Sequence, residues 1–478
     1  MSSVPPVIAE AFSTERFRAD GHRLIDAVAD ALARWQRREG VVLSWRTPDE
    51  ALGMWSRKGF GGVDLIDDLR RIMASSTALA HPHCMAHQVP PPLPGSALAE
   101  LVSAILNNGM AVYEMGPAAV PIELSVIEWM CSKLGYGEGA SGVLTSGGSL
   151  GNLTALLAMR QAHAGFDVWK QGAHAGPPLA VIVSSDAHYS VARTLRIMGW
   201  GDEGAIVAPV DQQHRLTAEA VEKAMSFGHG KKIIGIVAAA GSTATGAFDP
   251  LHELADVAER HGLWLHVDAA HGGGAALSLG QRHKLSGIER ADSIVWDAHK
   301  LMMMPALVTA VLFKNGAHTY EAFAQQASYL FANAAPEETW WDLGQRTLEC
   351  TKRMMAIEVW TALRVHGEEL FGEIIDRLVV LAAEMAARLR NTDDFEVALD
   401  PELNIVCYRH RPYELEPGPG LDAHNRSLRQ RVVEDGRFYI VGTQLPRGYF
   451  LRSTIMNPLI EPSDFDALIE HLRSLCRS

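Results

Sequence analysis

Apolar positions near the N-terminus recur with a helical period. Between residues 15 and 38 they fall three or four residues apart, which predicts an amphipathic helix. A second helix is expected from Ala97 to Ala111, directly after the proline-rich stretch VPPPLPG. The apolar positions of the first helix are Phe17, Leu24, Ile25, Val28, Leu32 and Trp35.

Short apolar runs of strand length alternate with helical patterns through the middle of the chain. Thr217–Met225 and Leu251–Arg260 are two such helical patterns. This alternation predicts an α/β domain built on a mostly parallel sheet. The candidate strands are Val143–Thr145, Ala180–Ser184, Ile233–Ala239, Leu263–Val267, Ser293–Trp296 and Val308–Phe313.

The C-terminal third changes character. A long helical pattern runs from Arg346 to Leu389, with a break expected near Gly367. Short strand-like runs then alternate with one more helix, which predicts a small α+β domain, and PYELEPGPG is expected to be a surface loop. The candidate elements are strands at Phe395–Leu399, Ile405–Tyr408, Tyr439–Val441 and Tyr449–Ser453, and a helix near Asp422–Glu434.

Composition narrows the function classes. The chain has 478 residues and a formal net charge of −13, with acidic and basic residues mixed along it. A nucleic-acid-binding protein would carry a basic face, and none is visible. The five cysteines are scattered without a C-x-x-C pair, which indicates a reducing compartment. The most apolar stretch, LMMMPALVTAVLF, is too short to cross a bilayer, so we expect a cytoplasmic protein without membrane contact.

Three polar clusters follow predicted strands, where ligands gather in open α/β sheets. The first is TSGGSLGN, the second is HVDAAHGGG and the third is WDAHK. The first contains a formal G-x-S-x-G at Gly147–Gly151, which occurs in serine hydrolases. The same glycines at the start of a helix could equally bind a phosphate through backbone N–H groups.

Two interpretations compete with cofactor binding. A serine hydrolase would use Ser149 with Asp268 and His299, which follow it in the chain order of that fold. A metal site would use His266-x-Asp268-x-x-His271, or the histidines and cysteine of HPHCMAH. Most histidines have structural roles, so the sequence gives no metal prediction.

Lys300 distinguishes these interpretations. A lysine just past an apolar strand is costly to bury unless the amine is neutralised or used in chemistry. A lysine in a pocket can attack a carbonyl, such as the aldehyde of a phosphate-bearing cofactor. A phosphate loop, a strand-end Asp268 and a strand-end Lys300, in this order, are the parts that pyridoxal phosphate requires. The hydrolase interpretation gives Lys300 no role.

With these parts in place, the chain resembles the group II pyridoxal-phosphate-dependent amino-acid decarboxylases, relatives of the aromatic-amino-acid, glutamate and diaminobutyrate decarboxylases. The resemblance implies the aspartate-aminotransferase-like fold type I and a homodimer with its active site at the subunit interface. It also implies a dimer-wrapping helical segment over residues 1–75, a cofactor-binding domain over 76–370 and a small domain over 371–478. The matching motifs, in family order, are HPHCMAHQVPPP, TSGGSLGNLTAL, SSDAHYSVAR, GSTATGAFDP, LHVDAAHGGG, WDAHKLMMMP and LRSTIMNP.

The resemblance assigns roles residue by residue. Lys300 would carry the cofactor as a Schiff base, Asp268 would pair with the pyridinium nitrogen, and His188 would stack on the ring. From the residues alone, His188 could equally be a capping residue beside Asp186. The remaining cofactor contacts implied are Ser146, Gly147, Gly148, Ser149, Thr243, Ala270, Asp297 and His299.

Tyr329, in ASYLF, matches the tyrosine that this family uses to deliver a proton after carbon dioxide leaves. Relatives with phenylalanine there tend to make aldehydes, so Tyr329 indicates simple decarboxylation of an L-amino acid to its amine. The loop over residues 323–338 is expected to close over the site and exclude water. An aldehyde synthase, a serine hydrolase and a cofactor-binding scaffold without catalysis remain alternatives.

Two residues depart from the family pattern. His271 stands where a bulky aromatic residue is common, and Asp297 stands where asparagine is frequent. A carboxylate near a phosphate needs a backbone N–H or a cation beside it. The substrate candidates are His87, Gln88, Thr351 and Arg452. The segment HCMAHQVPPP, which holds His87 and Gln88, resembles the diaminobutyrate and acidic-substrate relatives more than the aromatic ones.

Overall fold

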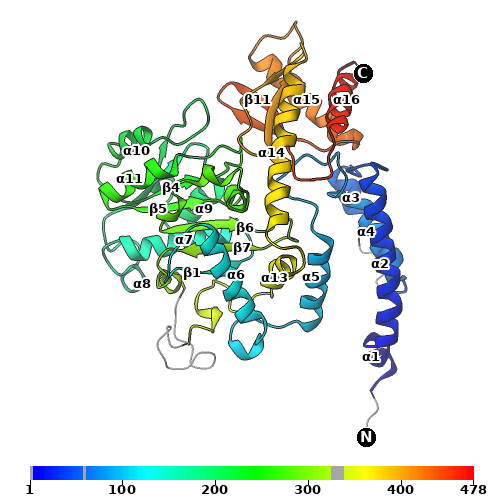
Figure 1. Ribbon diagram of the computed structural model, residues 1–478, viewed down its shortest axis with the longest axis horizontal. Helices are drawn as coiled ribbons and strands as arrows, with labels where there is room; N and C mark the ends of the chain where they lie inside the picture. Colours follow the sequence, from blue (N-terminus) through cyan, green and yellow to red (C-terminus); the bar gives the residue numbers. More distant parts are fainter. Residues whose placement is uncertain (1–3, 57–60, 324–338, 478) are drawn as a thin grey trace. The chain divides into compact units, whose positions relative to one another are not determined.

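The computed structural model describes residues 4–56, 61–323 and 339–477 (Figure 1). They form two compact units. The large unit is Gln88–Ala386 with Leu399–Cys407, and the small unit is Met1–His87 with Ala387–Ala398 and Tyr408–Ser478. The sequence predicts three consecutive domains with boundaries at residues 75 and 370, whereas each compact unit combines separated segments of the chain. The predicted domain boundaries stay a prediction.

A seven-stranded sheet lies at the centre of the large unit, in the order β1-β7-β6-β5-β4-β2-β3. β2 to β6 pair in parallel, whereas β7 is antiparallel to both β1 and β6. The predicted mostly parallel sheet is confirmed, and the reversal at β7 makes β1 point the same way as β6. The strands are β1 (Ser141–Thr145), β2 (Leu179–Ser184), β3 (Ala205–Ala208), β4 (Lys232–Ala239), β5 (Trp264–Asp268), β6 (Ser293–Asp297) and β7 (Thr309–Phe313).

These strands form because their sequences are almost continuously apolar, as buried parallel strands require. Every residue of β2, β6 and β7 is buried. α7 packs on β6 and β7, and α11 packs on β4 and β5. The helices of the large unit up to the sheet's last strand are α5 (Pro94–Leu106), α6 (Ala119–Lys133), α7 (Gly148–His163), α8 (Val168–Gln171), α9 (Tyr189–Ile197), α10 (Ala218–Met225) and α11 (Leu251–His261).

The predicted helix over Arg346–Leu389 is only partly helical. α12 (His318–Glu321) precedes it, and the helical part consists of α13 (Ala356–His366) and α14 (Glu369–Arg390). The predicted break at Gly367 is confirmed, and this residue has φ +74°. Residues 346–355 form bends and irregular backbone instead. The buried Arg346 donates to the Tyr320 hydroxyl and to the carbonyl of Trp340.

The small unit combines N-terminal helices with most of a second sheet, whose order is β10-β11-β9-β8. β8 and β9 pair antiparallel, as do β10 and β11, which confirms the predicted α+β character of this segment. Across residues 4–56, 61–323 and 339–477, no helix combines the length and apolar composition that a membrane span needs. The elements are α1 (Pro6–Ala11), α2 (Thr14–Gln36), α3 (Pro48–Met54), α4 (Leu65–Ser75), β8 (Phe395–Val397), β9 (Ile405–His410), α15 (Pro419–Asp435), β10 (Val441–Leu445), β11 (Gly448–Thr454) and α16 (Pro462–Arg477).

Candidate active site

A cavity of about 270 Å³ opens at the carboxyl ends of the strands of the large unit. Residues at or just after the ends of β1, β2, β4, β5 and β6 line it, as expected for a ligand site in an open α/β sheet. All the predicted cofactor contacts meet here: Ser146, Gly147, Gly148, Ser149, His188, Thr243, Asp268, Ala270, Asp297, His299 and Lys300.

The loop after β1 leads into the N-terminus of α7, which is suited to bind an anion. Gly147 has φ +114°, a conformation that favours glycine, and α7 begins at Gly148. A Cβ on Gly148 would lie 3.2 Å from an Asp297 carboxylate oxygen, so the backbone passes close to that side chain. Within the described part of the chain, no side chain caps this helix end, and its dipole favours a negative ligand.

Lys300 lies in the turn after β6 and faces Asp297. Its Nζ is 3.0 Å from Oδ2 of Asp297, and the Lys300 side chain is 18% exposed. The other carboxylate oxygen accepts a 2.5 Å hydrogen bond from the Thr309 hydroxyl, and Nε2 of His299 lies 3.6 Å from Oδ2. Asp297 therefore has a cation and a hydroxyl donor beside it, so its burial needs no backbone cap.

Asp268 ends β5 and is held by a residue that sequence reasoning missed. Asn152 donates a 2.9 Å hydrogen bond to Asp268 Oδ2, and the backbone N–H of Ala270 donates to Oδ1 at 3.2 Å. Asn152 also donates to the Ser190 hydroxyl and contacts His266 Nε2 through its carbonyl oxygen. The sequence feature that could have revealed Asn152 is its position one helical turn after Gly148, on the face of α7 that points toward the strand ends.

His188 caps a helix and also lines the cavity, so the capping role is observed and stacking on the cofactor ring stays a prediction. Its Nδ1 accepts the backbone N–H of Ser190 at 3.3 Å and lies 2.7 Å from the Ser190 hydroxyl, so it caps α9. The side chain also lines the cavity. Burial lowers the pKa of His188, although Asp268 acts in the opposite direction. The ring is therefore neutral near pH 7 and can stack on a flat ligand without adding charge.

His271, the other departure from the family pattern, also lines the cavity. It is buried, and its Nε2 lies 2.7 Å from Oδ1 of Asn404. This contact fixes the imidazole, so the position is occupied by an anchored polar ring in place of a bulky aromatic one.

The four substrate candidates are not among the described residues that line the cavity. Gln88 and Thr351 belong to the large unit, and the Thr351 hydroxyl accepts a backbone N–H 3.2 Å away. His87 and Arg452 belong to the small unit, where His87 contacts Tyr439 and Arg452 contacts Thr454. Tyr329 lies outside the described residues, as does the rest of the predicted lid beyond its first residue.

The geometry does not favour a serine hydrolase. His299 is hydrogen-bonded through Nδ1 to the backbone of Val308, and its Nε2 faces Asp297. Asp268 is occupied by Asn152 and a backbone N–H. In the described ranges, the Asp–His pair that would activate Ser149 is therefore not formed.

The two metal-binding stretches considered from the sequence also have other partners. Both ring nitrogens of the buried His266 are taken, one by the Ser293 hydroxyl and one by Asn152. His83 contacts the Asp464 carboxylate at 3.1 Å. Neither stretch forms a group of facing ligand atoms in the part of the chain that the structure describes.

The cavity fits pyridoxal phosphate. Its uncapped helix end would take the phosphate, and an amine stands beside a carboxylate at the end of β6. A second carboxylate, Asp268, stands at the end of the neighbouring strand β5, where it could face a ring nitrogen. These groups differ in charge and lie at adjoining strand ends, as a flat molecule with an anionic end and a basic ring requires.

Comparisons with known proteins agree with this geometry. A family model described as the pyridoxal-dependent decarboxylase conserved domain matches residues 62–411. Human cysteine sulfinic acid decarboxylase is 29% identical over 453 residues, with 91% of each chain covered. L-2,4-diaminobutyrate decarboxylase of Acinetobacter baumannii is 29% identical over 460 residues, covering 92% of this chain and 90% of its own. The crystal structure of mouse CSAD in apo form superposes with a TM-score of 0.89 at 26% identity, covering 97% of this chain and 99% of that chain.

Proposed function

Because this chain belongs to the pyridoxal-dependent decarboxylase family, we propose that Lys300, Asp268 and the Ser146–Ser149 loop bind pyridoxal phosphate for decarboxylation of an L-amino acid. The family activity is removal of carbon dioxide from an amino acid to leave the amine. The observation that carries the proposed roles is the convergence of the predicted contacts on one cavity. When bound, pyridoxal phosphate accepts the electrons left on Cα as carbon dioxide departs.

The loop and Lys300 would fix the two ends of the cofactor. Backbone N–H groups at the start of α7 would hold the phosphate, and Ser149 would serve as one more donor. Ser146 already donates a 2.9 Å hydrogen bond to Glu349, which ties the loop to residues 343–355. Lys300 Nζ would supply the amine that carries the cofactor until the substrate amine replaces it.

Asp268 would control the charge of the cofactor ring. A carboxylate within hydrogen-bonding reach keeps a ring nitrogen protonated, and the protonated ring attracts electrons more strongly. Asn152 is the positioning residue for this carboxylate, because its 2.9 Å hydrogen bond directs Asp268 Oδ2. The neutral His188 ring would cover the face of the cofactor.

Tyr329 would return a proton to the substrate carbon and so complete the release of an amine. This role rests on the family resemblance. An aldehyde synthase is the nearest alternative, and it is less favoured because the relatives named above are decarboxylases.

The proposed substrate class is an L-amino acid with a short polar side chain. Relatives that match nearly all of this chain are named for cysteine sulfinic acid and L-2,4-diaminobutyrate. Both side chains are short and charged, and the departure at His271 places an anchored polar ring in the cavity wall.

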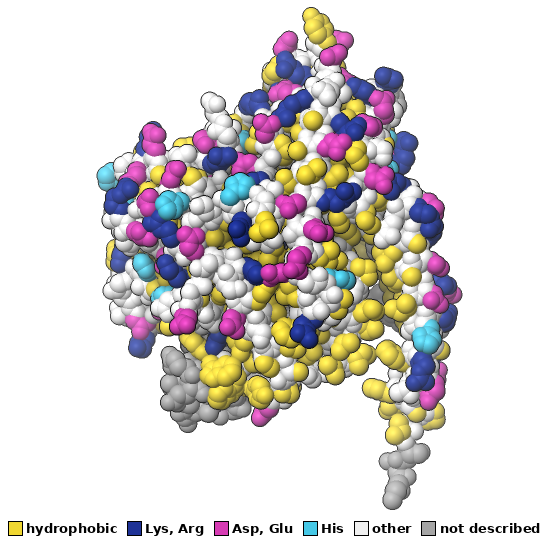
Figure 2. All heavy atoms as spheres, in the orientation of Figure 1, with side chains coloured by type: hydrophobic (Ala, Val, Ile, Leu, Met, Phe, Trp, Pro, Cys, Tyr) yellow, Lys and Arg dark blue, Asp and Glu magenta, His cyan; other side chains and the backbone are white. Residues whose placement is uncertain are grey.

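The proposed assembly is a cytoplasmic homodimer with its active site at the subunit interface. One face of α5 supports it, because this helix exposes five large apolar side chains that a monomer would leave in water. Figure 2 shows hydrophobic side chains gathered in the region of α5. The five are Leu98, Leu101, Val102, Ile105 and Leu106.

The test is borohydride reduction of the purified protein, followed by peptide mapping and a carbon dioxide assay with a panel of L-amino acids. We expect the cofactor mass on the peptide that contains Lys300, and carbon dioxide from cysteine sulfinate or 2,4-diaminobutyrate rather than from tryptophan. Lys300→Ala should abolish both the cofactor label and the release of carbon dioxide. Ser149→Ala should still bind the cofactor, but with lower affinity. Activity that survives Lys300→Ala and disappears in Ser149→Ala would refute the proposal. Oxygen consumption with ammonia release would identify an aldehyde synthase instead.

A further inference from the structure

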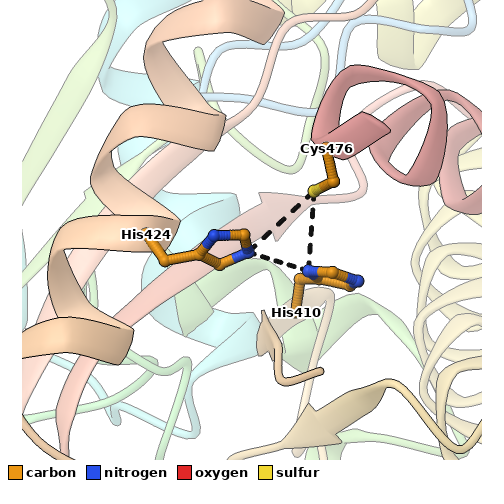
Figure 3. A group of neighbouring side chains, drawn as sticks. All are labelled: His410, His424 and Cys476. Atoms are coloured by element: carbon orange, nitrogen blue, oxygen red, sulfur yellow. Dashed lines mark hydrogen bonds between the residues drawn. The ribbon is translucent and has the colours of Figure 1, made fainter. Parts of the chain in front are cut away.

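Three potential metal ligands meet in the small unit, and none of them is among the described residues that line the cavity of the large unit. His410 ends β9, His424 lies in α15, and Cys476 lies in the last turn of α16 (Figure 3). His410 Nδ1 is 2.8 Å from His424 Nε2. Cys476 Sγ is 3.5 Å from the first of these nitrogens and 3.9 Å from the second.

This triangle has nearly the dimensions of three corners of a tetrahedral zinc site. With Zn–N bonds of about 2.05 Å and a Zn–S bond of about 2.3 Å, tetrahedral geometry places two nitrogens about 3.3 Å apart. The same geometry places a nitrogen and a sulfur about 3.6 Å apart. Moving each ligand atom by about half an ångström would satisfy all three separations. Two imidazoles and a thiolate are a donor set that zinc favours.

The backbone that presents these ligands is held by neighbouring side chains. Asn425, next to His424, accepts the N–H of His410 at 2.9 Å and donates to the carbonyl of His410 at 2.9 Å. Arg431 of α15 donates a 2.6 Å hydrogen bond to the carbonyl of Leu475, next to Cys476. The three ligands are therefore positioned by direct ties between α15 and the other two elements.

A carboxylate lies behind one of the histidines, as is common for histidines that bind a metal. Asp394 Oδ2 lies 3.5 Å from Nε2 of His410, the ring nitrogen that faces away from the cluster. A carboxylate in this place fixes the tautomer that leaves Nδ1 free to bind a metal. Arg473 pairs with Asp394 at 2.7 Å, so the carboxylate is itself held in place.

We propose that His410, His424 and Cys476 form a Zn²⁺ site in the small unit, with water as the fourth ligand. His424 and Cys476 are only partly buried, which leaves the fourth position accessible to solvent. The site would join the end of β9, α15 and the C-terminal turn of α16, and would act as a structural clip. The ligands are too far apart in the chain for any spacing motif to reveal them.

The test uses the full-length holoenzyme, loaded with Zn²⁺ and passed over a desalting column. Zinc per chain is measured by elemental analysis, and affinity by competition with a chromophoric chelator. We expect one tightly bound zinc, and at least about 10-fold weaker binding in Cys476→Ser and in His424→Asn. Cys350→Ser is the matched control, because it removes an exposed cysteine elsewhere and should bind zinc as the wild type does.

X-ray absorption at the zinc edge tests the ligands without any substitution. The proposal requires one sulfur at about 2.3 Å and nitrogen or oxygen ligands at about 2.0 Å. Zinc should also raise the Tm of the wild type but not of Cys476→Ser. A zinc shell without sulfur, or equal zinc affinity in the wild type and in a Cys476→Ser, His424→Asn double variant, would overturn the proposal. In that case the three side chains form only a hydrogen-bonded trio.

Discussion

Replacing Lys352 with methionine tests whether a buried ion pair holds β1, the strand that leads into the Ser146–Ser149 loop. Lys352 Nζ pairs with Glu123 Oε1 and donates a 2.7 Å hydrogen bond to the carbonyl of Leu144. Glu123 Oε1 also accepts the N–H of Leu144 at 3.0 Å. β1 is an edge strand that pairs with β7, and this ion pair satisfies the N–H and C=O of Leu144 on its outer edge.

The expected loss of stability follows from what the substitution leaves behind. The side chains of Lys352 and Glu123 are 4% and 1% exposed, so neither charge can recover water when its partner is removed. Lys352→Met should therefore lower the free energy of unfolding by about 3–5 kcal/mol, and Glu123→Gln by a similar amount. The double variant removes both charges and leaves mainly the Leu144 carbonyl unsatisfied, a cost of about 1–3 kcal/mol.

The assay is urea unfolding followed by tryptophan fluorescence at a fixed excess of cofactor. Lys133→Met is the matched control, because Lys133 and Glu123 lie on the same helix and Lys133 pairs with a partly exposed Glu368. This control should cost no more than about 1 kcal/mol. A double variant that loses the sum of the two single effects would refute the reasoning, because it would show that the charges do not depend on each other.

Three further perturbations probe the large unit. Asn152→Leu removes the hydrogen bond to Asp268, so kcat should fall about 10-fold to 100-fold while the protein retains its cofactor, measured by absorbance. His188→Asn keeps a helix cap and removes the ring, so the Tm should stay within error of that of the wild type. The affinity for the cofactor should fall up to about 10-fold, and an affinity equal to that of the wild type would contradict stacking. Burial, then repulsion from Glu100, raises the pKa of Glu358 to about 8 from 4.5. The folded state thus holds a proton that the unfolded state releases, and stability should fall as pH rises from 4.5 to about 8. Glu358→Gln should remove this slope in urea unfolding measured across that range, and an unchanged slope would exclude Glu358 as its source.

The sequence predicts the interior strands and the edge strands β1 and β8, but it does not place the edge strands β3 and β10. β2, β4, β6 and β7 lie within a residue or two of their predicted positions, since strands buried on both faces have continuous apolar runs. No apolar run predicts β3, and the strand predicted over Tyr439–Val441 shares only Val441 with β10, which begins two residues later. Both are edge strands with exposed or polar residues that weaken the apolar signal.

The residues that line the cavity are predictable from the sequence for a related reason. Its residues sit at strand ends, so the order of strands along the chain already brings Ser149, Asp268 and Lys300 to one edge of the sheet. Asn152 was missed because its role depends on the direction of a helix relative to two strands. The cluster of His410, His424 and Cys476 depends on contacts between elements that are far apart in the chain. No local sequence pattern predicts such contacts.

The position of β1 in the sheet has a consequence for the order of events during synthesis. Its partner in the sheet is β7, so Thr145 can pair with Thr309 only after most of the large unit has been made. The polar contacts on the other edge of β1 come later still, with Lys352. Contacts between residues so far apart in the chain form slowly, because a long loop must close before they stabilise anything. On a ribosome, the Ser146–Ser149 loop would therefore reach its folded position late, after the parallel strands from β2 to β6 had emerged. The nascent chain would carry an unpaired β1 until then.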